Sequence, residues 1–402
     1  MPPEMWTEMW PAAAQTRGPL PETADTVVIG GGLVGAAVAY YLAKEGGEVL
    51  LVERGELNRE ASGTNAGSFH FQIALHQLTE RGTAASRERL LGDLRLHLEA
   101  ARLWWQLEDE LEADLRLHRT GGLMVAETEE ELQLLRDKHA IEEEAGLETH
   151  VLETAELRAF APYLAHDLAG ATWCPSEGHA DPFLPVPLFI RRALELGAEI
   201  RAGVDVTEIT PDLHVRTTAG TVRAGRVVNA AGAWARELAA RSGIDLPTRA
   251  VPLHVNVTEP RARMLEPLVQ HIGRRLTLKQ TDHGTFIIGG GWPGGRRGLS
   301  GRHGTSWRSA AGNAAVAVRV MPSLSGVRLL RTWTGVMAFT NDLEPVVGEV
   351  AALPGYFVCV AMSGFTLAPL LGRMVARHLA HGEPIPAAYS PDRHSASMSR
   401  GR

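Results

Sequence analysis

Residues 27–53 read VVIGGGLVGAAVAYYLAKEGGEVLLVE, and this stretch decides the fold class. The β-branched run 27–29 predicts a strand, the alanine-rich run 33–44 predicts a helix, and the apolar run 49–52 predicts a second, parallel strand. A strand, a helix and a parallel strand in this order form a βαβ unit. The stretch therefore predicts an α/β fold with a Rossmann-type domain near the N-terminus.

The turn between the first strand and the helix carries a dinucleotide-binding pattern. Gly30, Gly32 and Gly35 form GxGxxG, and Glu53 stands at the end of the second strand. Glycine allows the tight turn, the close approach of a pyrophosphate and the contact of helix with strand, while free N–H groups at the helix start face the phosphates. The acid can accept hydrogen bonds from the ribose hydroxyls. A tight βα turn without a ligand would leave Glu53 unexplained.

Composition limits the class of protein. The chain has 402 residues, 45% of them hydrophobic and 22% charged, with a net charge of −7. This size predicts two domains, and the acidic balance gives no basic footprint for nucleic acid. Cys174 and Cys359 are the only cysteines, which favours a reducing compartment, so we expect a cytoplasmic protein. We expect no signal peptide and no membrane span, because no leader pattern and no run of about 18 apolar residues occurs.

A second glycine motif tests whether two dinucleotides bind. Gly289, Gly291 and Gly294 repeat the spacing, but RRGLSGRHG follows them instead of a helix, and no acid-terminated strand comes next. The sequence therefore predicts one dinucleotide site. NAD and FAD both bind this geometry, and the single site without a CxxC pair favours FAD as a resident redox cofactor. An NAD(P)H reductase with two dinucleotides is the disfavoured alternative.

Further patterns predict the other elements of the chain. We expect a cofactor-lining loop at 59–72, one long amphipathic helix at 86–113, a solvated helix at 127–144, and alternating strands over 246–325 with a hairpin turn at 282–284. The nucleotide domain is thus expected to be discontinuous, with an inserted, mainly antiparallel α+β substrate domain. The predicted division is a loose arm at 1–23, an FAD-binding domain at 24–88, 172–246 and 327–390, a substrate domain at 89–171 and 247–326, and a tail at 391–402.

Several ordered motifs together resemble a known family. They are the quoted βαβ stretch, ASGTNAGS, GVDVTEI, NAAGAWA, and the terminal series WTG, EPVVG and SGFTLAP. Over roughly residues 24–385 the sequence is similar to the D-amino-acid-oxidase superfamily of FAD-dependent amine oxidoreductases, specifically its glycine oxidase and sarcosine oxidase branch. The segments NAGSFHFQ and MAFT look most like subunits that oxidise opine-type secondary amines.

The resemblance implies a set of FAD contacts. Adenosine would lie at Glu53, Arg54 and the backbone of Val206, and the last turn would aim a helix N-terminus at the flavin pyrimidine. The complete expected set is Gly30, Gly32, Leu33, Val34, Gly35, Glu53, Arg54, Ala61, Ser62, Asn65, Ala66, Gly67, Ser68, Val206, Ala231, Gly232, Trp234, Met362, Ser363, Gly364, Phe365 and Thr366.

The resemblance also bears on how the flavin is held. Members of the branch attach flavin covalently through a histidine in the flavin loop or a cysteine late in the chain. Here Asn65 and its neighbours are not histidine, and Cys359 lies in an apolar strand. We therefore expect non-covalent FAD.

Two histidines are candidate catalytic groups. His70 follows the flavin loop, and His254 lies on the predicted strand PLHVNV. Histidine exchanges protons near neutral pH, so either could serve the amine chemistry. The alternative is structural, since most of the 16 histidines are expected at the surface or in hydrogen-bonded core positions.

The substrate pocket departs from the family pattern. Met337 and Met362 stand where glycine oxidase-like members carry carboxylate-binding arginines, and Phe286 and Ile288 stand where small-amine oxidases carry tyrosine. Trp292, Arg296 and Arg297 replace the segment that holds a lysine in sarcosine oxidase-like members. We expect an apolar pocket, with a carboxylate bound by Lys279, His254 or Arg297, unless an unaligned arginine binds it.

These features predict a function. The expected activity is FAD-dependent oxidation of the C–N bond of an amino acid amine, an N-substituted glycine or opine-like secondary amine, to an imine that hydrolyses. Electrons would pass to O2 or another acceptor. The alternatives are an oxidase of glycine or D-amino acids, and a flavoprotein subunit that passes electrons to a partner chain in a hetero-oligomer. A homo-oligomer is a further alternative, and no metal is expected.

Overall fold

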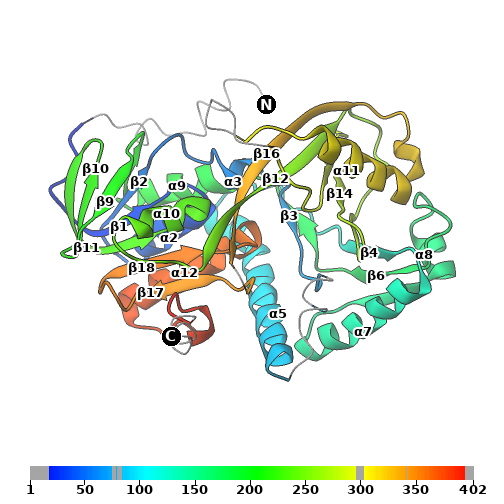
Figure 1. Cartoon of the computed structure of the whole chain (residues 1–402), viewed down its shortest axis with the longest axis horizontal. Coiled ribbons are helices and arrows are strands. Elements are labelled where there is room, and N and C mark those ends of the chain that lie inside the picture. The colour runs from blue at the N-terminus through cyan, green and yellow to red at the C-terminus, as the bar shows by residue number, and fades with distance from the viewer. Residues whose placement is uncertain (1–17, 75–77, 79–83, 296–302, 341, 394–402) are drawn as a thin grey trace, which may run out of the picture.

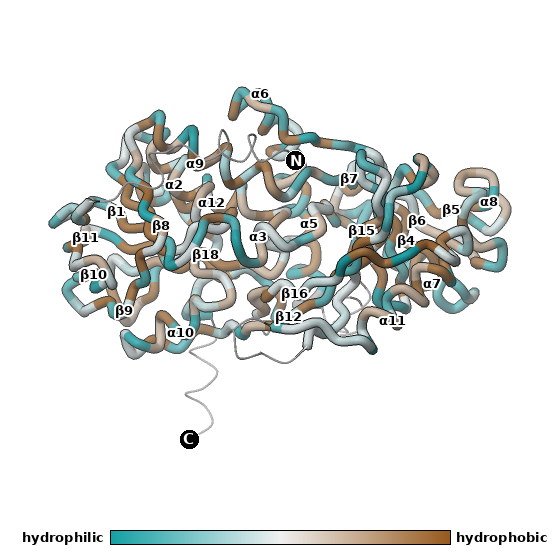
Figure 2. Tube along the Cα trace, turned by 90° about the horizontal axis from the view of Figure 1, so that it is seen from above, coloured by the Kyte–Doolittle hydropathy of each residue, from teal (hydrophilic) through white to brown (hydrophobic). Residues whose placement is uncertain are grey.

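The structure is a computed structural model that describes residues 18–74, 78, 84–295, 303–340 and 342–393. Among these residues, two eight-stranded sheets form the two ends of the molecule, and a two-stranded sheet lies between them (Figure 1). Apolar segments are concentrated in the sheets and in the helices that cover them (Figure 2). Most of the predicted N-terminal arm and of the C-terminal tail falls outside the described residues.

The first sheet is built on the predicted βαβ unit. Strand β1 lies in its interior and pairs in parallel with both β2 and β11, as a Rossmann-type sheet requires. The order is β17-β18-β11-β1-β2-β8, and β9 and β10 extend it beside β11. The strand bounds are β1 Thr23–Ile29, β2 Val49–Glu53, β8 Glu199–Ala202, β9 Val206–Ile209, β10 His214–Thr217, β11 Gly220–Asn229, β17 Val346–Glu349 and β18 Tyr356–Val360.

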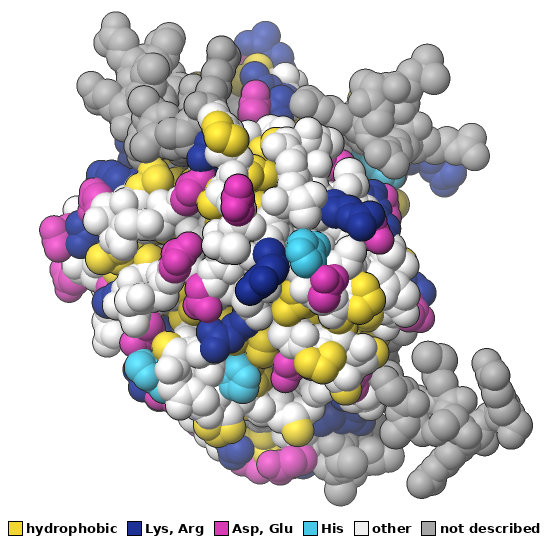
Figure 3. Space-filling model, turned by 90° about the vertical axis from the view of Figure 1, so that its left-hand side faces the viewer, with side chains coloured by type: hydrophobic (Ala, Val, Ile, Leu, Met, Phe, Trp, Pro, Cys, Tyr) yellow, Lys and Arg dark blue, Asp and Glu magenta, His cyan; other side chains and the backbone are white. Residues whose placement is uncertain are grey.

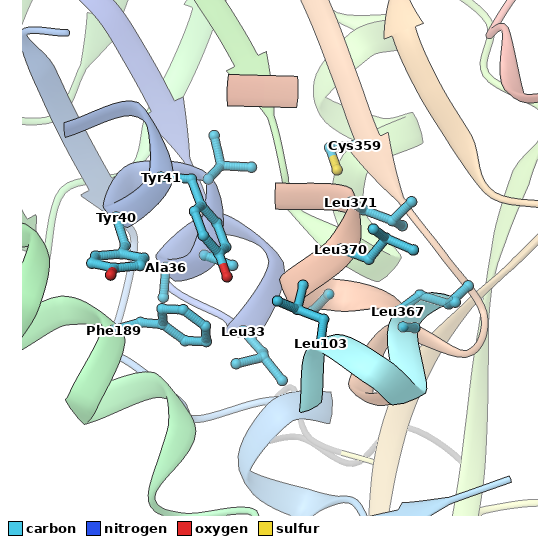
Figure 4. Packing of buried hydrophobic residues seen from close by; sticks show 14 of the residues in the cluster. Leu33, Ala36, Tyr40, Tyr41, Leu103, Phe189, Cys359, Leu367, Leu370 and Leu371 are labelled. Carbon is cyan, nitrogen blue, oxygen red and sulfur yellow. The ribbon is translucent and has the colours of Figure 1, made fainter. Parts of the chain in front are cut away.

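Helix α2 (Leu33–Lys44) is buried on nearly every side. It packs between α9 (Pro185–Glu195) and α12 (Gly364–His381), so an alanine-rich helix with no polar face is stable here. Tyr40 and Tyr41 of α2 meet Phe189 of α9, with ring centroids 5.5 and 6.1 Å apart (Figure 4). The burial fixes the direction in which the start of α2 points.

The second sheet forms the opposite end of the molecule. Its order is β16-β12-β15-β14-β13-β4-β6-β5, and most neighbours are antiparallel. The bounds are β4 Gly122–Ala126, β5 His150–Glu153, β6 Gly170–Cys174, β12 Thr248–Thr258, β13 Leu268–His271, β14 Thr277–Gln280, β15 Phe286–Gly289 and β16 Leu329–Thr340. The remaining elements are β3 Ser68–Phe69, β7 Gly178–His179, α3 Ala61–Thr64, α5 Ala84–Trp104, α6 Leu107–Leu111, α7 Glu129–Ala145, α8 Thr154–Phe160, α10 Ala235–Ala240 and α11 Trp307–Val320.

Three sequence-based expectations for helices were wrong in detail. The expected helix 86–113 is divided into α5 and α6, because the chain turns at Trp105 and Gln106, directly after the fully buried Trp104. The expected solvated helix at 127–144 is α7, whose inner face is buried and includes two charged residues. Helix α11 lies inside the region expected to alternate in strands, since its small side chains gave a weak helical pattern.

Strand pairing does not follow the predicted domain limits at two points. Strand β6 and strand β16 both belong to the second sheet, although residues 172–246 and 327–390 were assigned to the FAD-binding domain. The predicted hairpin with its turn near 282–284 is present as β14 and β15. The division into domains stays a proposal, because a sheet can be shared across such limits.

The surface of the first-sheet end is mixed in character. Acidic and basic side chains are interspersed on this face, and apolar side chains lie between them in small groups (Figure 3). Within the described residues, no helix combines the length and the hydropathy that crossing a membrane would need.

A buried polar network ties the segment after the flavin loop to the second-sheet end of the molecule. Lys138 and Glu142 of α7 are fully buried, and the Lys138 Nζ donates to both Glu142 oxygens at 2.8 and 2.9 Å and to Gln72 Oε1 at 2.9 Å. Glu177 accepts from the backbone N–H groups of Phe71 and Gln72 at 2.8 and 3.0 Å, and burial raises the pKa of its carboxyl. The network therefore holds residues 71–73, which follow the flavin loop, against the second sheet.

Replacing Lys138 by Met should destabilise the protein by roughly 3–5 kcal/mol, because it leaves the Glu142 carboxylate buried without its charge partner. Guanidinium unfolding followed by circular dichroism measures the change. Arg136→Met on the same helix is the matched control, since Arg136 is partly exposed and water screens its ion pairs with Glu129 and Glu153, so its loss should cost much less. Equal stability of the Lys138→Met and Arg136→Met proteins would contradict a structural role for the buried pair.

Candidate active site between the two sheets

A cavity of about 1060 Å³ runs from the start of α2, past the loop 61–68, to the second sheet. The predicted cofactor residues other than Gly35 line it: Gly30, Gly32, Leu33, Val34, Glu53, Arg54, Ala61, Ser62, Asn65, Ala66, Gly67, Ser68, Val206, Ala231, Gly232, Trp234, Met362, Ser363, Gly364, Phe365 and Thr366. These residues come from chain segments far apart in sequence, so folding brings the predicted set together at one cavity.

Gly30 and Gly35 of the first turn are each required for a different structural reason. Gly30 has φ +116°, and a Cβ on it would lie 2.6 Å from the carbonyl oxygen of Ala230. A Cβ on Gly35 would lie 1.9 Å from the carbonyl oxygen of Gly30. Gly35 therefore does not border the cavity but lets helix and strand touch, which is the third role of the motif.

Glu53 is held in place by backbone donors. Its Oε2 accepts from the N–H of Gly31 at 2.7 Å, and its Oε1 accepts from the N–H of Gly55 at 2.8 Å. A carboxylate has about four acceptor positions, so Glu53 keeps acceptor capacity toward the cavity. Beside it, the guanidinium of Arg54 stacks over the ring of Trp234, 4.1 Å from the centroid.

The flavin loop is braced from within. The hydroxyl of Ser62 accepts from the N–H of Leu33 at 2.9 Å, at the start of α2. Asn65 donates to the carbonyl of Ala61 at 3.1 Å and accepts from the N–H of Gly67 at 2.6 Å. Asn65 therefore has a structural task in the loop besides its position on the cavity wall.

The start of α12 forms another wall of the cavity. Ser363 is its N-cap residue and makes no side-chain cap, so the first N–H groups are without that partner and carry the positive end of the helix dipole. Phe365 stacks on Phe69 with centroids 5.5 Å apart, and the Trp104 Nε1 donates to the carbonyl of Thr366 at 2.7 Å. Aromatic packing thus fixes the direction of this helix start.

These features fit FAD. The starts of α2 and α12 offer N–H groups for phosphate and for the electron-rich edge of a flavin, and Glu53 offers acceptors for a ribose. A long cavity with donors at separate points is what an extended dinucleotide needs. Within the described residues, no group of acidic, histidine or cysteine side chains could hold a metal ion.

His70 lines the cavity next to the loop. Burial, followed by the nearby Lys279, lowers the pKa of His70 to about 4, so its ring is neutral at physiological pH. Its Nδ1 is buried and has no hydrogen-bond partner among the described residues. A neutral ring with one nitrogen unpaired can exchange a hydrogen bond with a ligand.

His254 uses one of its two ring nitrogens in a hydrogen bond, and its Nδ1 is buried without a partner among the described residues. Its Nε2 lies 2.8 Å from Asn256 Oδ1, and the Asn256 Nδ2 donates to the carbonyl of Ala310 in α11 at 3.0 Å. His254 and Asn256 are two residues apart on β12 and share one face, the face toward α11. His254 borders the cavity, but its hydrogen bond favours the structural alternative that the sequence left open.

Some of the residues expected in the substrate pocket line the cavity, and others lie on the opposite face of their strand. Met337 and Met362 line the cavity. The prediction for Phe286 and Ile288 was wrong: both are buried in the core between the second sheet and α11, outside the cavity lining. In the register of β14 and β15, Ile287 is opposite Lys279, so Ile287 and not its neighbours shares the face of that lysine.

Trp292 also lies outside the cavity lining, because its Nε1 donates to the carbonyl of Arg275 and a Cβ on Gly312 would meet its ring. Arg296 and Arg297 fall outside the described residues.

Lys279 lies behind the flavin loop and is only 5% exposed. Its Nζ would be 3.3 Å from a Cβ on Gly67, and burial lowers its pKa to about 7. Lys279 is not part of the cavity lining, so the expectation that it binds a substrate carboxylate directly has no support in this geometry.

Sequence reasoning missed several polar side chains at the second-sheet end of the cavity, among them Gln270, Arg275 and Thr277. Polar residues at 275, 277 and 279 alternate along RLTLKQ, and that period was the available signal for a polar strand face.

Comparison with known proteins agrees with this geometry. A model of the family described as "DAO: FAD dependent oxidoreductase" matches residues 25–378. Mouse mitochondrial sarcosine dehydrogenase is 28% identical over 93% of this chain and 41% of its own length. An opine oxidase subunit of Rhizobium meliloti is 29% identical over 89% of this chain and 94% of its own length.

A solved structure gives the same result. The crystal structure of L-proline dehydrogenase from P. horikoshii superposes with a TM-score of 0.83 at 27% identity, covering 94% of this chain and 99% of that one. The chain spans less than half the length of mouse sarcosine dehydrogenase but nearly all of the Rhizobium opine oxidase subunit. The resemblance inferred from the motifs is confirmed: this chain belongs to the DAO family of FAD-dependent oxidoreductases.

Proposed function

We propose that this protein binds FAD without a covalent bond and oxidises the C–N bond of a secondary amine that bears a carboxylate. The observation that carries the proposal is one continuous cavity that joins the dinucleotide turn at Gly30 and Gly32 to an apolar pocket at Met337 and Met362. The relatives are named for sarcosine, an opine and L-proline, and sarcosine and proline are both secondary amines with a carboxylate.

FAD, when bound, would accept a hydride from the carbon next to the amine nitrogen, and water would hydrolyse the resulting imine. The residues of the chain would position the substrate and provide the electrostatic environment for the reaction. The apolar lining formed by Leu253, Val255 and Met337 favours an uncharged amine, because burial disfavours the ammonium form. The start of α12 stabilises negative charge at Ser363 and Gly364. His70, neutral and unpaired at Nδ1, is the candidate to hold the amine or a water.

Non-covalent binding is supported by the groups that face the cofactor. Asn65 has no nucleophilic atom and is occupied by loop hydrogen bonds. Cys359 lines the cavity, but burial raises its pKa to about 12, so the unreactive thiol form persists at neutral pH.

A second candidate function is favoured by one observation. The Rhizobium opine oxidase chain, which this chain covers over 94% of its length, is named as one subunit of its enzyme. We therefore also consider a flavoprotein subunit that passes electrons to a partner chain in a hetero-oligomer, with O2 as the acceptor if the chain acts alone. A soluble, cytoplasmic location remains an expectation from composition. Oxygen consumption by the purified chain separates the two functions.

Acid precipitation of the yellow protein should release all the flavin as intact FAD into the supernatant, identified by chromatography and fluorescence. The reason is that neither Asn65 nor the protonated Cys359 can form a bond to the flavin. Flavin that stays in the washed precipitate would rule out non-covalent binding.

Glu53→Ala should weaken FAD binding roughly 10- to 100-fold, since a charge-assisted hydrogen bond contributes about 1.5–3 kcal/mol. Titration of the apoprotein, followed by quenching of flavin fluorescence, measures the dissociation constant. Glu56→Ala is the control, because Glu56 is exposed near the same strand end and, within the described part of the chain, its ion pair is with Arg59. Equal FAD affinity in the two variants would remove Glu53 from the binding site.

An anaerobic screen of flavin reduction should show glycine and sarcosine to be poor substrates compared with larger secondary amines. Met337 and Met362 provide apolar volume where an arginine would bind a small amino acid carboxylate, and methionine adapts to irregular apolar groups. The panel contains glycine, sarcosine, D-amino acids, L-proline and N-alkyl glycines of increasing length. Sarcosine reducing the flavin as fast as every longer amine would exclude an enlarged pocket.

A further inference from the structure

Three polar side chains meet at the end of the cavity that is built by the second sheet. Gln270 of β13 is directly opposite Thr277 of β14 in the antiparallel register. Arg275 precedes Thr277 by two residues, at the turn that enters β14. Opposite residues of an antiparallel pair share one face, so Gln270 and Thr277 do, and Arg275 borders the same cavity from the segment before the strand. All three line the cavity, and neither the cofactor contacts nor the oxidation step uses them.

These side chains lack acceptors among the described residues. The Gln270 Nε2 is buried without a hydrogen-bond partner. The Arg275 guanidinium forms no ion pair and no hydrogen bond with any described side chain. A buried N–H donor without a partner costs free energy, so native proteins usually match such a group with a ligand or water.

The other arginines on the cavity wall are already occupied. Arg274 makes two bonds to the Glu127 carboxylate at 2.6 and 3.0 Å. Arg241 donates to the carbonyl of Val206 and to Glu237, and Arg54 stacks over Trp234. Among the described arginines that line the cavity, Arg275 is therefore the cation left without an interaction.

The wall between this end and the flavin loop is apolar. Leu253, Val255 and Met337 belong to it, on the neighbouring strands β12 and β16, and Met124 lies beside Gln270 on β4. An apolar stretch that ends in a guanidinium, an amide N–H and a hydroxyl fits a ligand with an apolar arm and a terminal anion. A carboxylate suits this set, because guanidinium binds it through two parallel hydrogen bonds.

The set lies at the entry of β14, whereas the flavin loop touches that strand farther along, at Lys279. The Lys279 Nζ, two residues after Thr277 on β14, would be 3.3 Å from a Cβ on Gly67 of the loop. Arg275 precedes β14, so it lies on the opposite side of Thr277 from Lys279. Its side chain is exposed at the rim, where a distal group can reach it.

We propose that Gln270, Arg275 and Thr277 bind a carboxylate at the far end of the substrate, so that the enzyme selects secondary amines with a terminal carboxylate on a methylene arm. This inference rests on the proposed amine oxidation. Arg275 contributes the charge, and Gln270 and Thr277 orient the carboxylate by hydrogen bonds.

The test compares matched substrates with the FAD-loaded enzyme. N-methyl ω-amino acids of increasing arm length are each paired with the analogue in which a carboxamide replaces the terminal carboxylate. Anaerobic flavin reduction gives an apparent Kd for each compound. The wild-type enzyme should prefer the acid roughly 10-fold, a modest factor because water screens the exposed guanidinium. Arg275→Met should abolish the preference, and Arg275→Lys should keep part of it. Arg274→Met, which removes a neighbouring but paired charge, should retain it.

A binding measurement separates this inference from the proposed function. Methylthio-alkanoates have the same shape and carboxylate but no oxidisable amine, and calorimetry measures their binding. Their affinity should fall roughly 10-fold in Arg275→Met and stay unchanged in Arg274→Met. If no amine reduces the flavin but this difference persists, the proposed oxidation fails and the carboxylate site stands. Equal affinity or equal acid preference in wild type and Arg275→Met overturns the inference.

Discussion

The contact between Gly35 of α2 and the carbonyl of Gly30 is the constraint on which the site depends. Any side chain at Gly35 would fall 1.9 Å from that oxygen, so the helix can start this close to β1 only with glycine. Packing of α2 between α9 and α12 then holds the contact, with Phe189 against Tyr40 and Tyr41. As a result the start of α2 borders the cavity, with Gly32, Leu33 and Val34 in its lining.

The flavin loop transmits this arrangement to the second sheet. Asn65 closes the loop on itself, and Glu177 holds the following backbone at Phe71 and Gln72. The buried Lys138–Glu142 pair anchors the same segment from α7. His70 lies between the loop that Asn65 braces and the segment that Glu177 holds, so its position on the cavity wall is set by hydrogen bonds on both sides of it in the sequence.

The pocket combines an apolar centre with unpaired donors at its outer end. Met337 and Met362 line the cavity, and Arg275, at the turn before β14, has no ion pair or hydrogen bond with a described side chain. A cation at the rim binds a different substrate carboxylate from a cation at the reacting centre, because an ion pair needs direct contact between the two groups. The proposed selectivity follows from this position of the cation.

The sequence by itself determined the βαβ unit, the single dinucleotide motif, the loop 61–68 and the helix start at Ser363, because glycine spacing and apolar runs are local properties. It did not determine which face of the sheet each strand residue occupies. A shift of the strand register by one residue moves every side chain to the opposite face, and the register depends on the partner strand. Phe286 and Ile288 were therefore placed on the wrong face, and Arg275 was missed. Only the tertiary structure buried Lys138 beside Gln72 and placed the His254–Asn256 pair against Ala310 of α11, because Gln72 and Ala310 belong to other segments of the chain.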